Sequence, residues 1–185
     1  MLKKILIGIV GLVVLLAVVG LLIPSSYRVE RSIQINAPVE TVFAQVVDVK
    51  NWENWSPWKE QDPTINTTYG DVTSGIGGHF SWTSENSGDG SLTITEVEEN
   101  RKIKTDLDFG DQGTANGFWM FTQNDEGVKV TWGFSGDFGY NLMGRYIGLM
   151  MDSFAGPDLE KGLANLKKTA EAMPVPETEQ ITEKQ

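Results

Sequence analysis

The first pattern in the chain is an unbroken apolar run near its N-terminus. Residues 5–23 contain neither a charged residue nor a proline. As a helix rising about 1.5 Å per residue, this run would extend roughly 28 Å, close to the thickness of the hydrocarbon core of a bilayer. A helix also satisfies its own backbone hydrogen bonds in lipid. The pattern therefore predicts an N-terminal membrane anchor over residues 1–26, with residues 5–23 in the membrane.

Two other interpretations of this run are a cleaved secretory signal and a buried core helix. A signal peptide would have a shorter apolar core, of about 7 to 15 residues, followed by small residues at the cleavage site. The exit here reads Leu21-Leu22-Ile23-Pro24-Ser25-Ser26, which lacks that pattern, so we favour the anchor. Lys3 and Lys4 precede the run but Arg28 and Arg31 follow it. The difference in positive charge between the two flanks of the run is therefore small, and it favours a cytoplasmic N-terminus with the domain outside the cytoplasm.

After the apolar run, a strand pattern is followed by a helix pattern. Apolar and polar residues alternate from 29 to 36, which predicts a strand whose inner face carries one charge, that of Arg31. Arg31 is near the start of the strand, where a long side chain can still reach water. Asn36-Ala37-Pro38 then supplies a helix cap and a proline suited to a first turn. We expect a helix of about three turns to follow.

The middle of the chain has the pattern of an antiparallel meander. From residue 64 to 136, short alternating runs are separated by Gly, Asn and Asp. The clearest strand covers residues 102–109 and has one largely apolar face and one charged face. Residues 115–121 carry rings on both faces, so we expect both faces of this strand to be covered.

The last part of the chain is predicted to be helical. Residues 142–154 are rich in Met and should form a helix that is interrupted at Gly156-Pro157, where the proline opens a second helix with an apolar stripe. Residues 174–185 have too little apolar content to fold and are expected to be a disordered tail. The anchor and the tail then flank one domain, residues 27–173.

Composition narrows the classes of partner. After Ser26 the chain carries 25 acidic and 13 basic residues, a net charge of −12, without a basic patch. This charge repels phosphate backbones, so we expect no nucleic acid partner. The chain has no cysteine and a single histidine. Disulfides and thiol chemistry are excluded, and we expect neither a metal nor another cofactor.

Four segments of residues 27–173 together resemble a known superfamily. They are residues 35–43 (INAPVETVF), 52–58 (WENWSPW), 130–132 (VTW) and 156–167 (GPDLEKGLANLK). The set resembles the START-like, or SRPBCC, superfamily, in the branch called polyketide cyclase/dehydrase-like. The order of elements agrees with an α+β helix-grip fold, an antiparallel sheet curled around a long C-terminal helix. The resemblance implies a deep apolar cavity between the sheet and that helix.

Large aromatic residues converge on the faces that are predicted to point inward. They either fill a solid core or line a ligand pocket together with flexible methionines. The expected lining residues are Phe80, Trp82, Phe109, Trp119, Phe121, Trp132, Phe134 and Met150. Another aromatic group, Trp52, Trp55 and Trp58, either closes one end of the core, forms the mouth of the pocket, or is exposed to a protein partner.

Few residues suggest catalysis, because acid–base chemistry requires titratable groups inside the pocket. His79 alternates with inward rings and should face solvent, and Asp106 and Asp108 share a charged outer face with lysines. We assign no catalytic residue. The sequence predicts a membrane-anchored domain that binds a hydrophobic small molecule or lipid without converting it. A cyclase, dehydratase or hydrolase and a protein-interaction module remain the alternatives, and the oligomeric state is open. A cavity-facing carboxylate or tyrosine with a shifted pKa would favour the enzyme.

Overall fold

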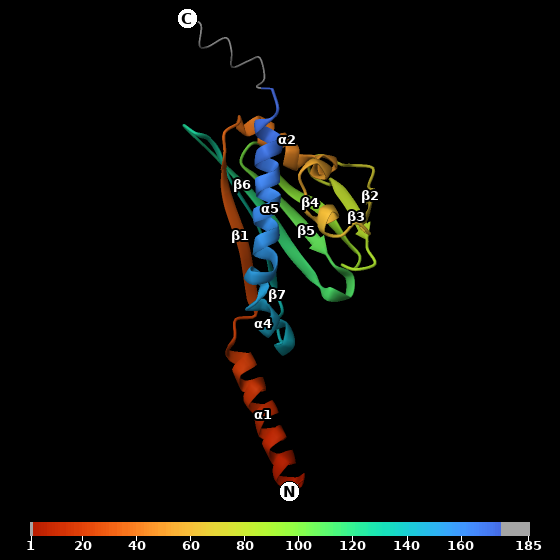
Figure 1. Ribbon diagram of the computed structural model, residues 1–185, viewed down its shortest axis with the longest axis vertical. Helices are drawn as coiled ribbons and strands as arrows, with labels where there is room; N and C mark the ends of the chain where they lie inside the picture. The colour runs from red at the N-terminus through yellow and green to blue at the C-terminus, as the bar shows by residue number, and fades with distance from the viewer. Residues whose placement is uncertain (1, 175–185) are drawn as a thin grey trace, which may run out of the picture.

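The protein is built around one antiparallel sheet with helices on one of its faces (Figure 1). A computed structural model describes residues 2–174, so the predicted tail lies almost entirely outside the described residues. The sheet has seven strands in the order β1-β7-β6-β5-β4-β3-β2, so that all neighbours along the chain pair except β1, which closes against β7. The strands are β1 (Ser26–Ile35), β2 (Asn66–Tyr69), β3 (His79–Thr83), β4 (Gly90–Glu98), β5 (Lys102–Asp108), β6 (Thr114–Asn124) and β7 (Gly127–Asp137).

The helices form three groups. The first, α1, stands apart from the sheet, α2 and two short segments follow β1, and the last two helices end the described chain (Figure 1). A single 3-10 turn lies outside these groups, between β5 and β6. They are α1 (Leu2–Leu22), α2 (Val39–Val47), the 3-10 helix η1 (Val49–Asn54), α3 (Trp58–Gln61), the 3-10 turn η2 (Gly110–Gln112), α4 (Leu142–Gly148) and α5 (Met151–Glu171). This arrangement confirms the α+β helix-grip fold.

The long helix α5 packs its apolar stripe on the sheet. Leu159, Leu163 and Leu166 are fully buried in one core with Val29 and Ile35 of β1. The alternation predicted for the first strand is confirmed, because Val29 and Ile35 point inward while Glu30 is exposed. Burial of three leucines contributes roughly 1.5–3 kcal/mol each. The stripe of α5 is therefore a main source of the stability that holds helix and sheet together.

The predicted cap of α2 is wrong. The residue before its first turn is Pro38, which provides no side-chain cap. Asn36 instead donates its backbone N–H to the carboxylate of Glu171 on α5, at 2.8 Å. Lys167 donates to the carbonyl of Gln34 at 2.8 Å. The end of β1 is thus attached to the last turns of α5. Asn36 takes part in this tertiary contact instead of capping α2.

The predicted break between the last two helices is also misplaced. The chain bends at Leu149–Met150, and α5 runs through Pro157. Pro157 falls in the second turn, where it removes one backbone hydrogen bond. The residue before a proline normally avoids helical geometry because its Cβ is crowded. Gly156 has no Cβ, and its place is occupied by the guanidinium of Arg31. The helix therefore continues through the proline.

The outer face of β6 is open, which contradicts the expectation that both faces would be covered. Trp119 and Phe121 point into the core, whereas Met120 is 46% exposed. Phe118 lies under the guanidinium of Arg28, 4.0 Å from the ring centroid. One long cationic side chain covers this ring, and a second layer is not required.

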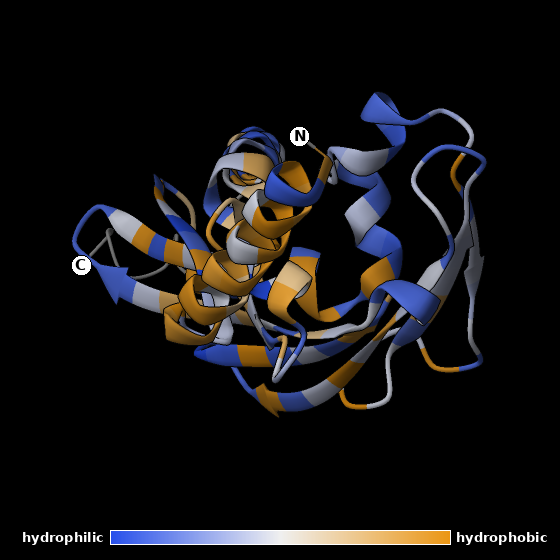
Figure 2. Cartoon of the chain, turned by 90° about the horizontal axis from the view of Figure 1, so that it is seen from below, coloured by the Kyte–Doolittle hydropathy of each residue, from blue (hydrophilic) through white to orange (hydrophobic). Residues whose placement is uncertain are grey.

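Helix α1 projects from the end of the sheet where β1 begins (Figure 1). It is long and apolar enough to cross a membrane, and most of what Figure 2 shows of it has hydrophobic colour. Gly20 is its only buried residue, which argues against the alternative of a core helix. A helix that is apolar all round and exposed to its surroundings has the properties of a membrane segment or a signal sequence.

Candidate ligand-binding cavity

A cavity of about 430 Å³ lies between the sheet and the segments η1, α3 and α5. Its wall on the sheet side is mostly apolar, with Phe80 and Trp82 of β3, Leu107 of β5, and Trp132 and Phe134 of β7. Ligand pockets are commonly about 300–1,000 Å³ and mainly hydrophobic. The volume therefore suits a small apolar molecule or part of a larger one.

The cavity exists because small and polar side chains occupy the floor between the rings. Thr105 of β5 and Gly117 of β6 are paired directly across the sheet, and both line the cavity. A Cβ on Gly117 would collide with the hydroxyl of Thr105. Larger residues at this pair would fill the floor. Side chains alternate between the two faces of a strand, so Thr105 and Leu107 both point to the inner face of the sheet.

Five of the eight residues predicted to line the pocket lie on its wall, and three do not. The five are Phe80, Trp82, Phe109, Trp132 and Phe134. Trp119 is fully buried and stacks on Trp132, with centroids 4.6 Å apart. Phe121 packs edge-on against Phe43 of α2, at 5.3 Å. These two rings point inward as expected, but other rings and α2 cover them. Met150 is 51% exposed, because the bend before α5 turns it away from the sheet.

The tryptophan cluster belongs mainly to the core. Trp52 and Trp55 are buried, and their indole N–H groups donate to carbonyls of α2, Trp52 to Val46 at 2.9 Å and Trp55 to Gln45 at 3.0 Å. Trp52 and Trp58 also line the cavity. The cluster thus closes the core and contributes to the pocket wall. Its two buried members are not available to a protein partner.

Polar lining residues gather on the helical side of the cavity. Glu53 of η1, Lys59 of α3, Asp62 just after α3 and Asp158 of α5 all border it. Gln61 donates to Asp158 at 2.7 Å and so joins α3 to α5. The sequence analysis did not anticipate these groups, because α3 has only four residues and gives no periodic pattern.

Asp62 is the centre of a hydrogen-bond network at one edge of the cavity. Its carboxylate accepts hydrogen bonds from the hydroxyls of Ser84, at 2.5 Å, and Ser87, at 2.7 Å. It also accepts from the hydroxyl of Thr64, at 2.6 Å, and the amide of Asn86, at 3.1 Å. These donors, Ser84 first, lower the pKa of Asp62 well below its usual range. Asp62 therefore stays ionised and fixes the loop between β3 and β4 to α3.

Tyr69 is the one cavity-lining tyrosine of residues 2–174. Its hydroxyl donates to the carboxylate of Glu53 at 2.9 Å. Burial raises the pKa of Tyr69, and the neighbouring Glu53 raises it further. This is the kind of group that the sequence analysis named as favouring an enzyme. At neutral pH its hydroxyl stays protonated and is engaged by Glu53.

The other titratable candidates lie away from the cavity wall. His79 is half-buried rather than solvent-facing, with its Nδ1 2.9 Å from the hydroxyl of Thr93 on the next strand. Asp106 and Asp108 are exposed on the outer face of β5, as predicted. These three side chains are not placed to act on a molecule in the cavity.

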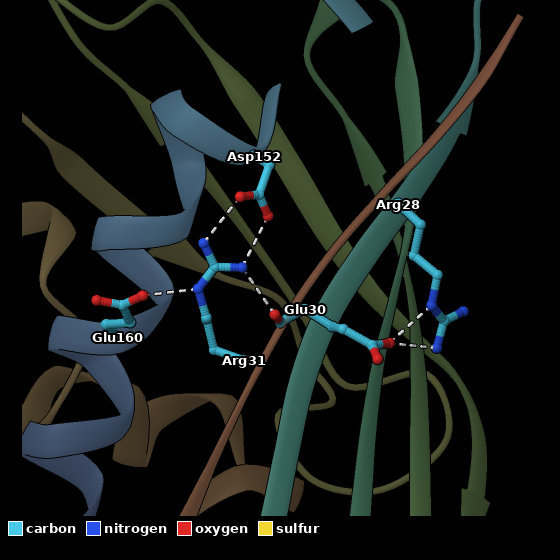
Figure 3. A network of polar contacts seen from close by, with 5 residues as sticks. All are labelled: Arg28, Glu30, Arg31, Asp152 and Glu160. Carbon is cyan, nitrogen blue, oxygen red and sulfur yellow. Dashed lines mark hydrogen bonds and ion pairs between the residues drawn. The ribbon is translucent and has the colours of Figure 1, made fainter. Parts of the chain in front are cut away.

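A polar network fixes the first turns of α5 above the cavity (Figure 3). Arg31 of β1 contacts both carboxylate oxygens of Asp152, at 2.7 and 3.1 Å, and Glu160 at 2.7 Å. The hydrogen bonds that Arg31 donates to Asp152 and Glu160 raise the pKa of its guanidinium above its usual range. The charge predicted on the inner face of the first strand thus binds the helix rather than only reaching water. Asp158 and Leu159, which line the cavity, lie between these two contacts on α5.

Comparison with known proteins agrees with this architecture. Residues 26–171 match the model of the family described as polyketide cyclase/dehydrase and lipid transport. None of the curated proteins matches the sequence. Among solved structures, protein CV1439 from Chromobacterium violaceum is similar with a TM-score of 0.58 and 15% identity, over 81% of this chain and 100% of that one.

Two further structures show the same fold. A protein of unknown function from Staphylococcus aureus, SA2116, has a TM-score of 0.59 and 9% identity, over 79% of this chain and 94% of that one. The di-domain ARO/CYC protein StfQ from the steffimycin biosynthetic pathway has a TM-score of 0.58 and 12% identity, over 79% of this chain and 51% of that one. At such low identity these structures support the fold alone. The family model, in contrast, spans most of the sequence, and the chain therefore belongs to the polyketide cyclase/dehydrase and lipid transport family of the START-like superfamily.

Proposed function

We propose that this protein is a membrane-anchored binding protein for a hydrophobic small molecule or lipid, which it holds in the cavity between the sheet and α5. The observation that carries the proposal is the cavity itself, about 430 Å³ in volume and walled by five aromatic rings predicted from the sequence. Burial of an apolar ligand against these rings would contribute roughly 25 cal/mol for each Å² removed from water.

The distribution of polar groups supports an amphipathic or weakly polar ligand. The sheet contributes mainly rings and Leu107, whereas the charged residues come from η1, from α3 with the residue after it, and from α5. An apolar body would lie on the sheet, with a polar end toward Lys59 and the carboxylates. Asp62 and Asp158 already accept hydrogen bonds from other side chains. The ammonium group of Lys59 is the cationic donor among the lining residues, and the hydroxyls of Ser56 and Thr67 are further donors at the wall.

Helix α1 would keep this domain beside the bilayer in which such ligands dissolve. Its length and composition support a membrane-spanning role, and tethering raises the effective concentration of the domain near lipid-borne molecules. We propose that the N-terminus is cytoplasmic and the domain lies outside the cytoplasm. Protease added to intact cells without an outer membrane barrier should then digest the domain.

Native mass spectrometry of the full-length protein in detergent tests the binding function. We expect a co-purifying apolar molecule that is released on denaturation. Leu107→Trp would place a ring into the cavity and should remove this molecule. Met120→Trp is the matched control, because it adds the same side chain on the open face of the neighbouring strand and should retain it. A wild-type protein without the molecule, or a Leu107→Trp variant that keeps it, would contradict the proposal.

The enzyme alternative is supported by one observation, the Tyr69–Glu53 pair at the cavity wall. A cyclase, dehydratase or hydrolase could use such a pair to move a proton, although the raised pKa makes Tyr69 a weak acid. In the native mass spectra described above, the enzyme alternative predicts that the Tyr69→Phe variant releases a molecule whose mass differs from that released by the wild type, because substrate accumulates in the variant. Simple binding predicts the same mass from both proteins.

A further inference from the structure

The exposed apolar side chains of the domain are concentrated at one end. Beyond α1, the described chain has nine exposed large hydrophobic residues, and six of them lie between residues 140 and 154. We call these six the α4 face: Tyr140, Met143, Ile147, Leu149, Met150 and Phe154. Tyr140 is 92% exposed and Met143 71%. A concentration of exposed apolar side chains within one short segment suggests a contact with another phase or protein.

The charge around this face differs from the rest of the domain. Residues 138–154 contain one acidic residue, Asp152, which is paired with Arg31, and one basic residue, Arg145, in a domain whose net charge is −12. Electrostatic repulsion from an anionic surface is therefore weakest here. An uncharged apolar face suits the boundary between lipid headgroups and acyl chains, and a tyrosine is a side chain that such boundaries favour.

The α4 face is fixed to the last turns of α1. The hydroxyl of Tyr146 donates to the carbonyl of Leu16 at 2.7 Å. Arg145 donates to the carbonyls of Leu21 and Ile23, each at 3.0 Å. Gly20 allows this approach, because a Cβ there would lie 3.2 Å from the ring of Tyr146 and 3.3 Å from Leu142. The arginine satisfies carbonyls that a helix end leaves without partners and complements its dipole.

These contacts determine the depth of α4 relative to α1. Leu16 lies about 9 Å along the helix axis before Leu22, at 1.5 Å per residue. A helix that hydrogen-bonds at Leu16 therefore lies against the final turns of the apolar run. Figure 1 shows α4 at the end of α1 that joins the domain. If α1 crosses a bilayer, α4 is held at the surface of that bilayer.

We propose that the α4 face is inserted into the headgroup layer of the bilayer that α1 crosses, so that the domain rests on the membrane in one orientation. This inference rests on the membrane-spanning role proposed for α1. Interfacial segments of this kind lie roughly 5–10 Å deep, at the acyl boundary. Arg145 is not free to keep the helix in water, because the carbonyls at the end of α1 engage it.

Single cysteines provide the test, because the natural chain has none. The full-length protein is reconstituted into phosphatidylcholine vesicles with a polarity-sensitive fluorophore at Met143→Cys or Leu149→Cys. Leu12→Cys reports on α1, and Ile76→Cys is the matched control, an apolar side chain 67% exposed in the loop between β2 and β3. Lipids that carry a nitroxide quencher are then added to the vesicles.

We expect the quencher to reduce the fluorescence at Met143, Leu149 and Leu12, with blue-shifted emission, and to leave Ile76 unchanged. Quenching at Leu12 alone would overturn the docking of the α4 face and leave the anchor intact. Blue-shifted emission at Met143 without quenching would also overturn it, because protein, such as a second copy, would then cover the face. No quenching at Leu12 would reject the anchor and the docking together.

Discussion

At the scale of single residues, the cavity depends on side chains whose roles follow from their partners. Thr105 and Gly117 keep its floor open because they face each other across two strands. Asp62 is buried, with four side-chain donors around its carboxylate. Sequence pattern alone does not single out Asp62, because its partners converge from two loops and meet only in three dimensions.

The first prediction concerns Asp62 and pH. Its folded-state pKa is lowered, so its contribution to stability is present above the unfolded pKa of about 3.9 and decreases as pH falls below that value. Asp62→Asn should therefore destabilise the protein at pH 7. Urea unfolding of the full-length protein in detergent, at a series of pH values, would measure the difference.

The difference between wild type and Asp62→Asn should be constant from pH 7 to about pH 5 and decrease under more acidic conditions. Asp106→Asn, on the exposed outer face of β5, is the control and should cause little change. An equal effect of both substitutions, or a difference that grows on acidification, would show that the Asp62 network does not stabilise the folded state.

At the scale of elements, the strands and the stripe of α5 could be predicted from periodicity, because the fold buries one face of each. Periodicity does not predict which of the inward-facing rings reaches the cavity. Trp119 and Trp132 are paired across two strands, and Trp52 and Trp55 pack against both. Only Trp132 lies at the cavity wall. The helix break was misplaced because Pro157 follows a glycine, and the contact of Arg31 with Asp152 joins residues 121 apart in sequence.

The Arg31 contact gives a prediction about α5. Arg31→Met removes the contacts with Asp152 and Glu160 and leaves an apolar side chain of similar length. The amides of the first turns of α5 should then exchange with deuterium faster, while its buried C-terminal half changes little. Hydrogen–deuterium exchange with peptide mass spectrometry reads out both halves.

Arg28→Met is the matched control for this measurement. Arg28 lies on the same strand but contacts only the outer face, where it pairs with Glu30 and covers the ring of Phe118. Exposed ion pairs of this kind stabilise a protein by at most about 1 kcal/mol. Exchange in α5 should not change. Unaltered exchange in Arg31→Met would mean that the leucine stripe alone fixes the start of this helix.

At the scale of the whole molecule, the cavity and the predicted anchor share one end of the sheet. Chain direction places them together, since three residues separate the end of α1 from the start of β1, and β5 and β7 both end on this side of the sheet. Phe109 follows the end of β5 and Phe134 is near the end of β7, and both line the cavity. A ligand that leaves the bilayer would therefore have a short path to these rings.

The most direct test of the central claim is photo-crosslinking from inside the cavity in living cells. A benzophenone amino acid replaces Phe80 on the cavity wall or, as the control, Phe118 on the opposite face of the sheet. After irradiation, the account predicts that the protein with the photo-reactive group at position 80 gains the mass of one apolar small molecule or lipid and that the control does not. No adduct at position 80, or equal adducts at both positions, would contradict the claim that the cavity holds a hydrophobic ligand.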